Sequence, residues 1–271
     1  MGVRLPRAFL ARALGAAALC ALVLPAPALA DERQALKTET DVGHVVEPAA
    51  APSVGVVLRE VPRDVWRFVS LDTAVVLAGG GGVALVAHVW DDDLVREIGE
   101  NPELNSAFEP GSQYGAFGVM LGGSFAVYGV GRVAGHRHMA VVGADLVRGQ
   151  IVSQVWVQAL KFTALRERPD HSNQRSFPSG HAAGAFATAA VLTRHYGWKA
   201  AIPAYLGATY IAAARVHDNK HYLSDVTFGA ALGLAGARTV MLKAGRYGFQ
   251  VAPAPVPRGI AVRATLVPAL R

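Results

Sequence analysis

Six apolar stretches of helical length run along the 271-residue chain, and they constrain its fold more than any other feature. All six are rich in Ala, Leu, Val and Gly. They cover Leu71–Trp90, Tyr114–Val133, Met139–Leu165, His181–Tyr196, Trp198–Ala214 and Val226–Leu242. The pattern predicts an all-α fold built as a six-helix bundle, with an acidic loop over residues 91–112 between the first two helices.

The two ends of the chain differ from this helical part. Residues 1–30 combine a basic start, an apolar run and a small-residue cleavage site, which is typical of a secretory signal peptide. Residues 31–55 are polar and then Pro- and Ala-rich, which predicts a flexible leader. We expect a helical domain over residues 56–245 and a Pro-containing tail over residues 246–271, irregular or β, with a short strand near Ile260–Val267.

The formal net charge of +6 is concentrated at the ends, because residues 1–30 carry three Arg and residues 243–271 carry five basic residues, both without acid. The remaining chain holds 18 basic and 20 acidic residues, which argues against a nucleic-acid-binding face. The basic tail suits either contact with anionic lipid or plain solvation. The single cysteine, Cys20, lies in the predicted signal, so the mature chain would have no disulfide and no thiolate nucleophile.

The sequence leaves open whether the helices lie in a bilayer. Residues 71–90 and 114–133 are long and nearly uncharged, as in membrane helices, whereas residues 139–165 include Asp145 and Arg148, which must face a polar interior. Basic loop residues opposite the acidic loop place that side in the cytoplasm, yet a cleaved signal peptide predicts the reverse topology. We therefore expect an exported protein of the periplasm or cell envelope, either soluble or membrane-associated.

A first polar block, Lys161 to Pro169, closes the third apolar stretch. Seven residues at about 100° each return Lys161 and Arg168 to one helical face, two turns apart. Pro169 disfavours helix at the residue before it, so we expect Arg168 near the helix end, where the two cations converge on a ligand. Basic residues are common at helix C-termini, so the pair alone is a weak signal.

A second block, residues 176–181, directly precedes the fourth apolar stretch. Ser179 is the predicted N-cap, and the free N–H groups around Gly180 and His181 form an anion site at the positive end of the helix dipole. Gly180 has no side chain, so an oxyanion can approach closely. His181 projects from the first turn, where an imidazolium can protonate a departing alkoxide. A cap followed by a surface histidine is the ordinary alternative.

A third block runs from Arg215 to Asp225. His221 and Asp225 are four residues apart, so on one helix the carboxylate can accept the proton-bearing ring nitrogen and leave the other nitrogen basic. The planar guanidinium of Arg215 can donate two parallel hydrogen bonds to phosphate oxygens. His217 is the competing nucleophile, but its eight-residue offset from Asp225 favours a loop histidine. The alternative for His221 and Asp225 is an ion pair on a helix surface.

Together the three blocks resemble, residue for residue, the signature of the type 2 phosphatidic acid phosphatase and vanadium haloperoxidase superfamily. That signature is Lys, six residues, Arg-Pro; then Pro-Ser-Gly-His; then Arg, five residues, His, three residues, Asp. The resemblance covers Val56–Leu242 in layout. One departure is Ala214, where the family often has Ser before the Arg of the third block.

The resemblance implies a phosphatase with a histidine nucleophile that needs neither metal nor cofactor, because fixed cations spread the developing charge. By this resemblance His221 attacks phosphorus to form a phosphohistidine, Asp225 orients it, and His181 protonates the leaving oxygen. The residues that would hold the phosphoryl oxygens are Lys161, Arg168, Ser179, Gly180 and Arg215.

The substrate stays open between a phosphorylated lipid, a polyprenyl pyrophosphate and the small phosphomonoesters of a broad-specificity acid phosphatase. Two other functions compete with this one. A vanadium-dependent haloperoxidase would bind vanadate in the same pocket, and a non-catalytic membrane component would bind lipid or an anion there. The intact His181, His221 and Asp225 argue against the non-catalytic alternative, since binding alone needs only cations.

Overall fold

The computed structural model describes residues 51–99, 101–241, 247–256 and 259–268, so the predicted signal peptide and nearly all of the leader lie outside the described residues. The helical part begins at Val54, close to the expected boundary. Its α-helices are α3 Val54–Phe68, α4 Leu71–Ala87, α5 Asp91–Ile98, α6 Asn105–Tyr114, α7 Phe117–Val133, α8 Arg137–Ala164, α9 Gly180–Tyr196, α10 Trp198–His217 and α11 Leu223–Met241. The predicted all-α fold is confirmed, and each of the six apolar stretches forms a helix.

The acidic loop predicted over residues 91–112 is wrong, because this segment forms α5 and most of α6. Three aspartates occupy the first turn of α5, where negative charge is favourable at the positive end of the helix dipole. Leu94 and Ile98 face inward from α5 and are buried. A sequence of high charge thus forms a helix because one face carries apolar residues that the bundle covers.

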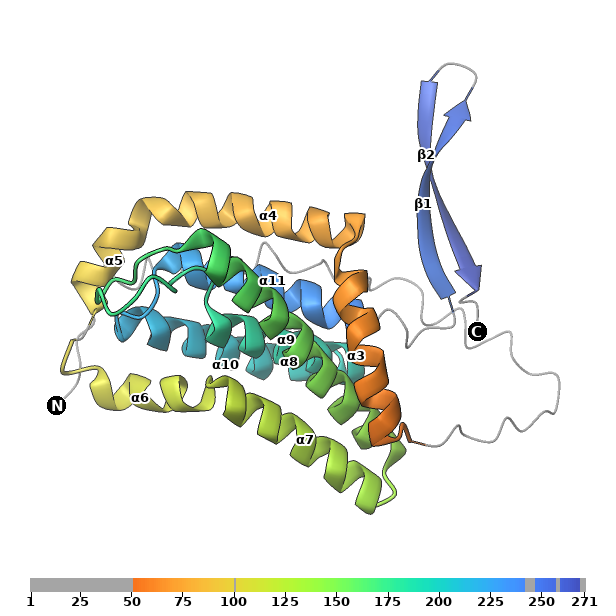
Figure 1. Cartoon of the computed structure of the whole chain (residues 1–271), viewed down its shortest axis with the longest axis horizontal. Coiled ribbons are helices and arrows are strands. Elements are labelled where there is room, and N and C mark those ends of the chain that lie inside the picture. The colour runs from red at the N-terminus through yellow and green to blue at the C-terminus, as the bar shows by residue number, and fades with distance from the viewer. Residues whose placement is uncertain (1–50, 100, 242–246, 257–258, 269–271) are drawn as a thin grey trace.

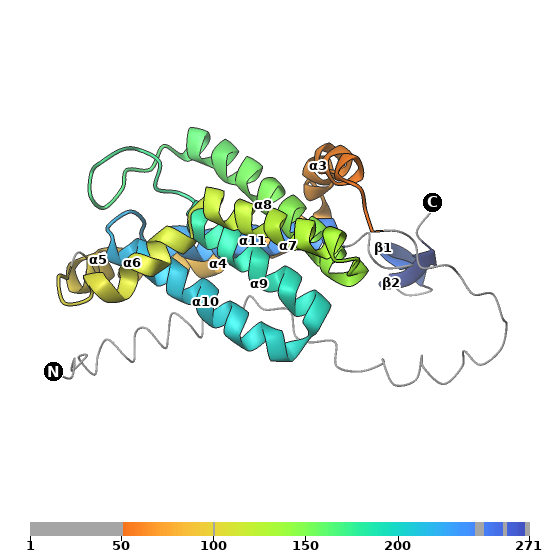
Figure 2. The ribbon, with the colours of Figure 1, turned by 90° about the horizontal axis from the view of Figure 1, so that it is seen from below.

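Helix α9 packs against α8, α10 and α11, and α11 also contacts α8 and α4 (Figures 1 and 2). Two glycines of α11 allow this helix to pack closely against α9. A Cβ added at Gly233 would lie 2.1 Å from the carbonyl oxygen of Ala183, and one at Gly229 would lie 2.5 Å from that of Ser179. This close packing brings the start of α9 beside the start of α11, where two of the three polar blocks meet.

The polar residues of α8 face the bundle interior, as predicted. Arg148 donates to Asp64 of α3 over 2.7 Å and to Asp145 over 3.4 Å. His195 of α9 lies 3.0 Å from Asp145. Gln150, also buried, donates to the carbonyl oxygen of Gly184 over 2.8 Å. These contacts satisfy groups that would be costly to bury alone.

Within the described residues, Leu71–Ile98 is long and apolar enough to cross a membrane. A second such segment appears only if α6 and α7, which meet at 58°, are counted as one span. By length and composition, this part of the chain therefore contains one or two segments that could span a membrane, and not six.

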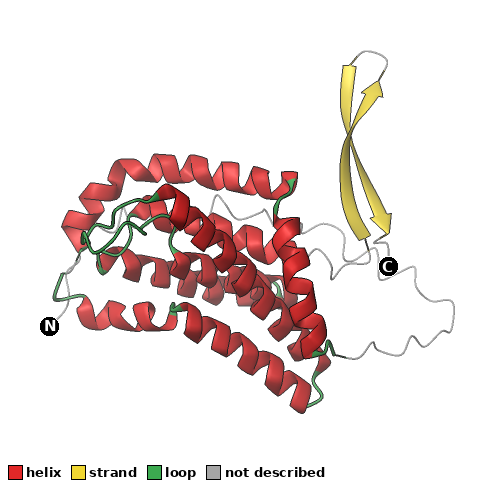
Figure 3. Ribbon diagram, in the orientation of Figure 1, coloured by secondary structure: helices red, strands yellow, loops and turns green. Residues whose placement is uncertain are grey.

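The tail forms an antiparallel hairpin of β1 Tyr247–Val256 and β2 Gly259–Pro268 (Figure 3). The strand predicted at Ile260–Val267 lies inside β2. The prolines before it exclude helix, as expected, and Pro253 and Pro255 lie in β1.

Candidate active site

Helix α8 ends at Ala164, so the prediction that Lys161 and Arg168 share one helical face is wrong. Leu165 has a φ of 46°, in the left-handed region, and this turns the chain out of the helix before Arg168. The two cations still come within electrostatic range, because the loop after the turn folds back. Lys161 is buried and its Nζ donates to the carbonyl oxygen of Arg175 over 2.5 Å.

The second block has the predicted geometry of a helix start. Ser179 is the N-cap of α9, and its side chain accepts from the N–H of Ala182 over 3.4 Å. The N–H of Ser179 donates to the carbonyl oxygen of Asp225 over 3.1 Å, which joins this block to the third. Gln154 of α8 donates to the carbonyl oxygen of Gly180 over 2.8 Å.

His221 lies in the loop before α11, and its closest partner is not Asp225. Its Nδ1 is 2.6 Å from the carbonyl oxygen of Ser176 and 3.9 Å from Oδ2 of Asp225. A carbonyl oxygen can only accept, so Nδ1 must carry the proton and Nε2 of the neutral ring is left unprotonated. The second ring nitrogen, Nε2, is therefore basic, as predicted. The group that fixes this tautomer is the backbone carbonyl of Ser176 and not the carboxylate of Asp225.

Asp225 orients His221 indirectly, through Ser176, and not by the direct contact that was predicted. It is fully buried, and Oδ2 accepts from Ser176 Oγ over 2.5 Å and from the N–H of Tyr222 over 2.9 Å. It thereby holds the residue whose carbonyl orients the histidine. Burial alone would raise the pKa of Asp225, but His221, Arg166 and Ser176 together hold it below its ordinary value.

Sequence reasoning missed Arg166, whose guanidinium joins two buried carboxylates. It donates to Asp225 Oδ1 over 2.7 Å, to Ser224 Oγ over 2.7 Å and to Asp91 Oδ2 over 2.9 Å. Its guanidinium carbon lies 4.2 Å from the centre of the Tyr222 ring. The only sequence signal was an extra arginine inside the first block. Nothing in the spacing indicates that Asp91, 75 residues earlier, is its partner.

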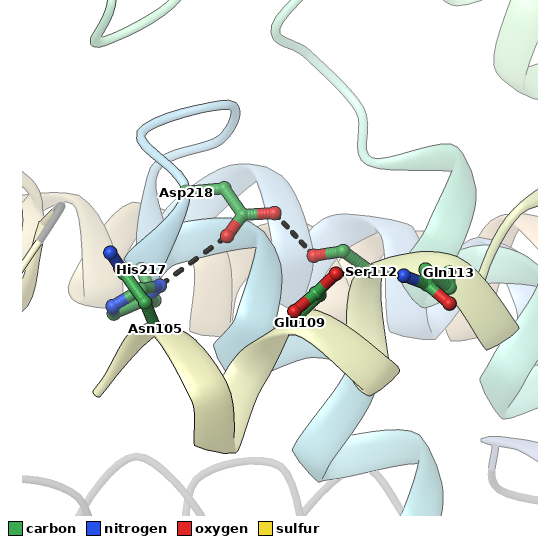
Figure 4. Close-up of a pocket in the computed structure, with 6 residues that line it drawn as sticks. All are labelled: Asn105, Glu109, Ser112, Gln113, His217 and Asp218. Atoms are coloured by element: carbon green, nitrogen blue, oxygen red, sulfur yellow. Dashed lines mark hydrogen bonds and ion pairs between the residues drawn. The ribbon is translucent and has the colours of Figure 1, made fainter. Parts of the chain in front are cut away.

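His181 is half-buried and contacts α6. Its Nε2 lies 3.2 Å from the carbonyl oxygen of Ser112, which requires the proton on Nε2 when the ring is neutral. Ser112 Oγ donates to Asp218, and Arg215 donates to the same Asp218 oxygen over 2.8 Å. Figure 4 shows Asp218 between Ser112 and His217. His217 is the buried last residue of α10, and not a loop residue.

The site concentrates positive charge. Burial, with Arg168 and Arg215 acting in the same direction and Asp225 opposing them, lowers the pKa of Lys161 to about 8. Burial also lowers the pKa of Arg215, with Arg168 acting in the same direction. The buried Nε of Arg215 has no hydrogen-bond partner among the described residues. Cations that depress one another's pKa, with an unpaired donor among them, form a site suited to an anion.

Both histidines are uncharged at neutral pH. Burial lowers the pKa of His221 to about 4, with Lys161 and Arg168 acting in the same direction and Asp225 opposing them. Burial and Arg215 lower the pKa of His181 to about 4. A buried neutral imidazole with a free Nε2, placed among cations, is suited to nucleophilic attack on a bound oxyanion.

The helical bundle thus brings residues of the three blocks together in one candidate site. Residues 143–247 match the family model of the PAP2 superfamily, which confirms the resemblance seen in the sequence. This part of the chain is therefore similar to the PAP2 superfamily.

Two curated relatives share part of this region. A lipid A 1-phosphatase of Porphyromonas gingivalis is 38% identical over 81 residues, which cover 29% of this chain and 18% of that protein. A lipid A 4'-phosphatase of Helicobacter pylori is 37% identical over 99 residues, which cover 32% of this chain and 50% of that protein. The chain thus spans half or less of the length of these relatives.

Two solved structures are similar in part. Aquifex aeolicus LpxE has a TM-score of 0.48 and 24% identity, over 56% of this chain and 94% of its own. A transmembrane PAP2 type phosphatidylglycerolphosphate phosphatase from Bacillus subtilis has a TM-score of 0.41 and 19% identity, over 68% and 92%.

Proposed function

We propose that this protein is a phosphatase that hydrolyses phosphate monoesters of a lipid through a phosphohistidine on His221. The observation that carries the proposal is the 2.6 Å contact between His221 Nδ1 and the carbonyl oxygen of Ser176, which leaves Nε2 unprotonated. The match of residues 143–247 to the PAP2 superfamily model and the two lipid A phosphatase relatives support the reaction class and a phosphorylated lipid as substrate. The apolar segment Leu71–Ile98 supports work at a membrane of the cell envelope.

The proposed reaction has two steps. In the first, Nε2 of His221 forms a bond to phosphorus while the bond from phosphorus to the leaving oxygen breaks, and His181 gives that oxygen a proton. In the second, the oxygen of a water molecule forms a bond to phosphorus while the bond from phosphorus to Nε2 of His221 breaks, His181 takes a proton from the water, and phosphate leaves. The groups that would bind the phosphoryl oxygens are Lys161, Arg168, Arg215, Ser179 and the N–H of Gly180.

Substrate binding raises the pKa of His181, so that the imidazole takes up from solvent the proton that it later donates. Burial, together with the positive charges of Arg215 and Lys161, lowers the pKa of its imidazole to about 4. A bound phosphate dianion neutralises these cations and so raises the pKa of the imidazole. No metal ion has a role in this proposal, because Lys161, Arg168 and Arg215 take the charge of the transition state.

The test uses the purified protein in EDTA with p-nitrophenyl phosphate, a short-chain phosphatidate and a polyprenyl pyrophosphate. We expect hydrolysis of a monoester, inhibition by vanadate below about 1 mM, and an acid-labile, base-stable phosphoenzyme on His221 after rapid quench. His221→Ala should lower kcat by roughly 10³-fold or more. His181→Ala should slow alkyl phosphates more than p-nitrophenyl phosphate, because the latter leaves without a proton.

Near-normal turnover by His221→Ala would show that the nucleophile is wrong. A phosphoenzyme that survives acid and is lost in base would place the phosphoryl group on an oxygen. Peroxide-dependent bromination with added vanadate, in the absence of phosphate ester hydrolysis, would point instead to a haloperoxidase.

A further inference from the structure

The residue before α11 is Tyr222, which is not a capping residue. Its carbonyl oxygen accepts the first hydrogen bond of the helix, from the N–H of Val226, over 3.2 Å. At this position Ser, Thr, Asp or Asn usually accepts from one of the first N–H groups, which have no partner inside the helix. The Tyr222 ring instead lies against Arg166, whose guanidinium carbon is 4.2 Å from the ring centre. The acceptor for the first turn of α11 therefore comes from elsewhere in the fold.

Asp91, the buried first residue of α5, supplies that acceptor. Its Oδ1 accepts from the N–H of Ser224 over 2.8 Å, and its Oδ2 accepts from Ser224 Oγ over 2.6 Å. The preceding helix α4 packs closely on α11, since a Cβ added at Gly80 would lie 2.1 Å from Cβ of Ala231. This packing brings the end of α4, and the start of α5 that follows it, into contact with α11.

The same carboxylate holds the guanidinium of Arg166. Ser224 Oγ gives its single proton to Asp91, so its lone pairs are left to accept from Arg166 over 2.7 Å. Arg166 also donates to Asp91 Oδ2 directly, over 2.9 Å, and His88 Nδ1 lies 2.7 Å from the same oxygen. An ionised carboxylate can only accept, so all of these contacts require that both oxygens of Asp91 stay acceptors.

The start of α11 carries the carboxylate that supports the nucleophile. Ser224, which Asp91 holds, is the residue before Asp225. Oδ2 of Asp225 accepts from Ser176 Oγ over 2.5 Å, and the carbonyl oxygen of Ser176 accepts from His221 Nδ1 over 2.6 Å. A displacement of the first turn of α11 therefore moves this carboxylate and, through Ser176, changes the direction of His221 Nε2.

We propose that Asp91 is a positioning residue of the phosphatase reaction, which holds the start of α11 through Ser224 and fixes the guanidinium of Arg166. It acts on His221 through these groups and binds no part of the phosphate. The inference rests on the proposed phosphatase function. It extends the site to a residue that lies before the segment 143–247, which matches the PAP2 superfamily model.

Asp91→Asn tests the inference, because it keeps the shape of the side chain and turns one acceptor into a donor. At Oδ1 the new amide N–H would face the N–H of Ser224, and at Oδ2 it would face Arg166, and neither group can accept. We expect kcat for p-nitrophenyl phosphate to fall roughly 10- to 100-fold, since both steps involve His221 Nε2, while KM changes less than about 2-fold.

Binding of inorganic phosphate separates positioning from folding. The cations proposed to bind phosphate are unchanged in Asp91→Asn, so the Kd should stay within about 2-fold of the wild-type value and the stoichiometry should be the same. Phosphate binding with unchanged stoichiometry means that the variant is folded, and the lower kcat then reports the chemistry. Isothermal titration calorimetry measures both quantities.

The matched control is Asp92→Asn. Asp92 is exposed and lies in the same first turn of α5, so its replacement makes the same change of charge at the same helix end without the contact to Ser224. Its kinetics should stay within about 2-fold of the wild-type values.

Two further variants sharpen the test. Ser224→Ala removes the hydroxyl but leaves the N–H that donates to Asp91, so kcat should fall by about 3- to 10-fold, the effect of one hydrogen bond. This variant decides the question if Asp91→Asn does not fold. Adding Asp91→Asn to Arg166→Lys should lower kcat by less than about 3-fold more, because both changes act through Asp225.

Several outcomes would overturn the inference. One is a kcat of Asp91→Asn, or of Ser224→Ala where Asp91→Asn does not fold, within about 2-fold of the wild-type value. Another is a kcat that falls only in proportion to the stoichiometry of phosphate binding, or equally in Asp92→Asn. Losses that multiply in full in the double variant also contradict it. Failure of the proposed function differs, since the wild-type protein would then hydrolyse no phosphate monoester, p-nitrophenyl phosphate included.

Discussion

Helices α8–α11 and helices α4–α7 both contain apolar residues, yet the two groups use them differently. In α8, α9 and α11 these residues are mostly small and buried, as at Ala183, which has no exposed surface. In α4 large side chains face outward, and Leu71 and Leu85 are exposed by 85% and 75%. The first group builds a tight interior around the candidate site, while the outward face of α4 suits contact with lipid.

The second group of helices still reaches the site at two points. Asp91, at the start of α5, accepts from Arg166 over 2.9 Å, and the carbonyl oxygen of Ser112 in α6 accepts from His181 over 3.2 Å. The PAP2 superfamily match begins at Gly143 and therefore includes neither contact. The part of the chain outside that match thus holds groups that orient the histidines inside it.

The largest effect on folding is expected at Gly233. A Cβ there would lie 2.1 Å from a backbone carbonyl oxygen of α9, which cannot move without separating the two helices. Gly233→Ala should lower the free energy of unfolding by about 3 kcal/mol or more, the upper range for an overpacked core. Denaturant unfolding of the purified protein measures this. A loss below about 1 kcal/mol would show that α9 and α11 do not pack so closely.

Arg166→Lys tests the contact between the two groups of helices. Lysine keeps the charge but cannot reach Asp225, Ser224 and Asp91 at once. We expect kcat to fall roughly 10- to 100-fold while KM changes less than about 2-fold, because Arg166 supports Asp225 and does not bind the phosphate.

The matched control for Arg166→Lys is Arg96→Lys. Arg96 forms an exposed ion pair with Asp93 in α5, so its replacement should leave kinetics unchanged. A rise in KM at unchanged kcat in Arg166→Lys would instead place Arg166 among the phosphate-binding residues.

Stability should depend on pH through the two histidines. Their pKa values of about 4 lie below the ordinary value of 6.5, so between these limits the unfolded chain binds more protons than the folded one. Stability therefore rises with pH across this window and is lost as pH falls from 6.5 to 4. Thermal unfolding of the wild-type protein and of His221→Asn measures the effect.

We expect the melting temperature to depend less steeply on pH in His221→Asn, which lacks one of the two groups. Bound vanadate should also reduce the dependence, since an anion raises both histidine pKa values. An equal slope in all three cases would mean that neither imidazole is held neutral by its surroundings.

The sequence predicted the helices and the three blocks because both depend on local patterns. Apolar periodicity marked α9, and the Ser179 cap marked its start. Contacts between distant residues left no such pattern. The turn at Leu165 could not be anticipated, since a left-handed leucine is unusual, and so the relation of Lys161 to Arg168 was misjudged. The partner of His221 was missed because it is a backbone carbonyl, which every residue has.

The smallest effect, and the one that probes the outer helices most directly, is expected at Gly79 of α4. A Cβ there meets no atom within 4 Å, in contrast to Gly233. Glycine in a helix interior is less favourable than alanine by about 1 kcal/mol, so Gly79→Ala should stabilise the protein by up to that amount in detergent. A destabilisation would show that this face of α4 packs closely against another apolar surface, and the contrast between the two groups of helices would then disappear.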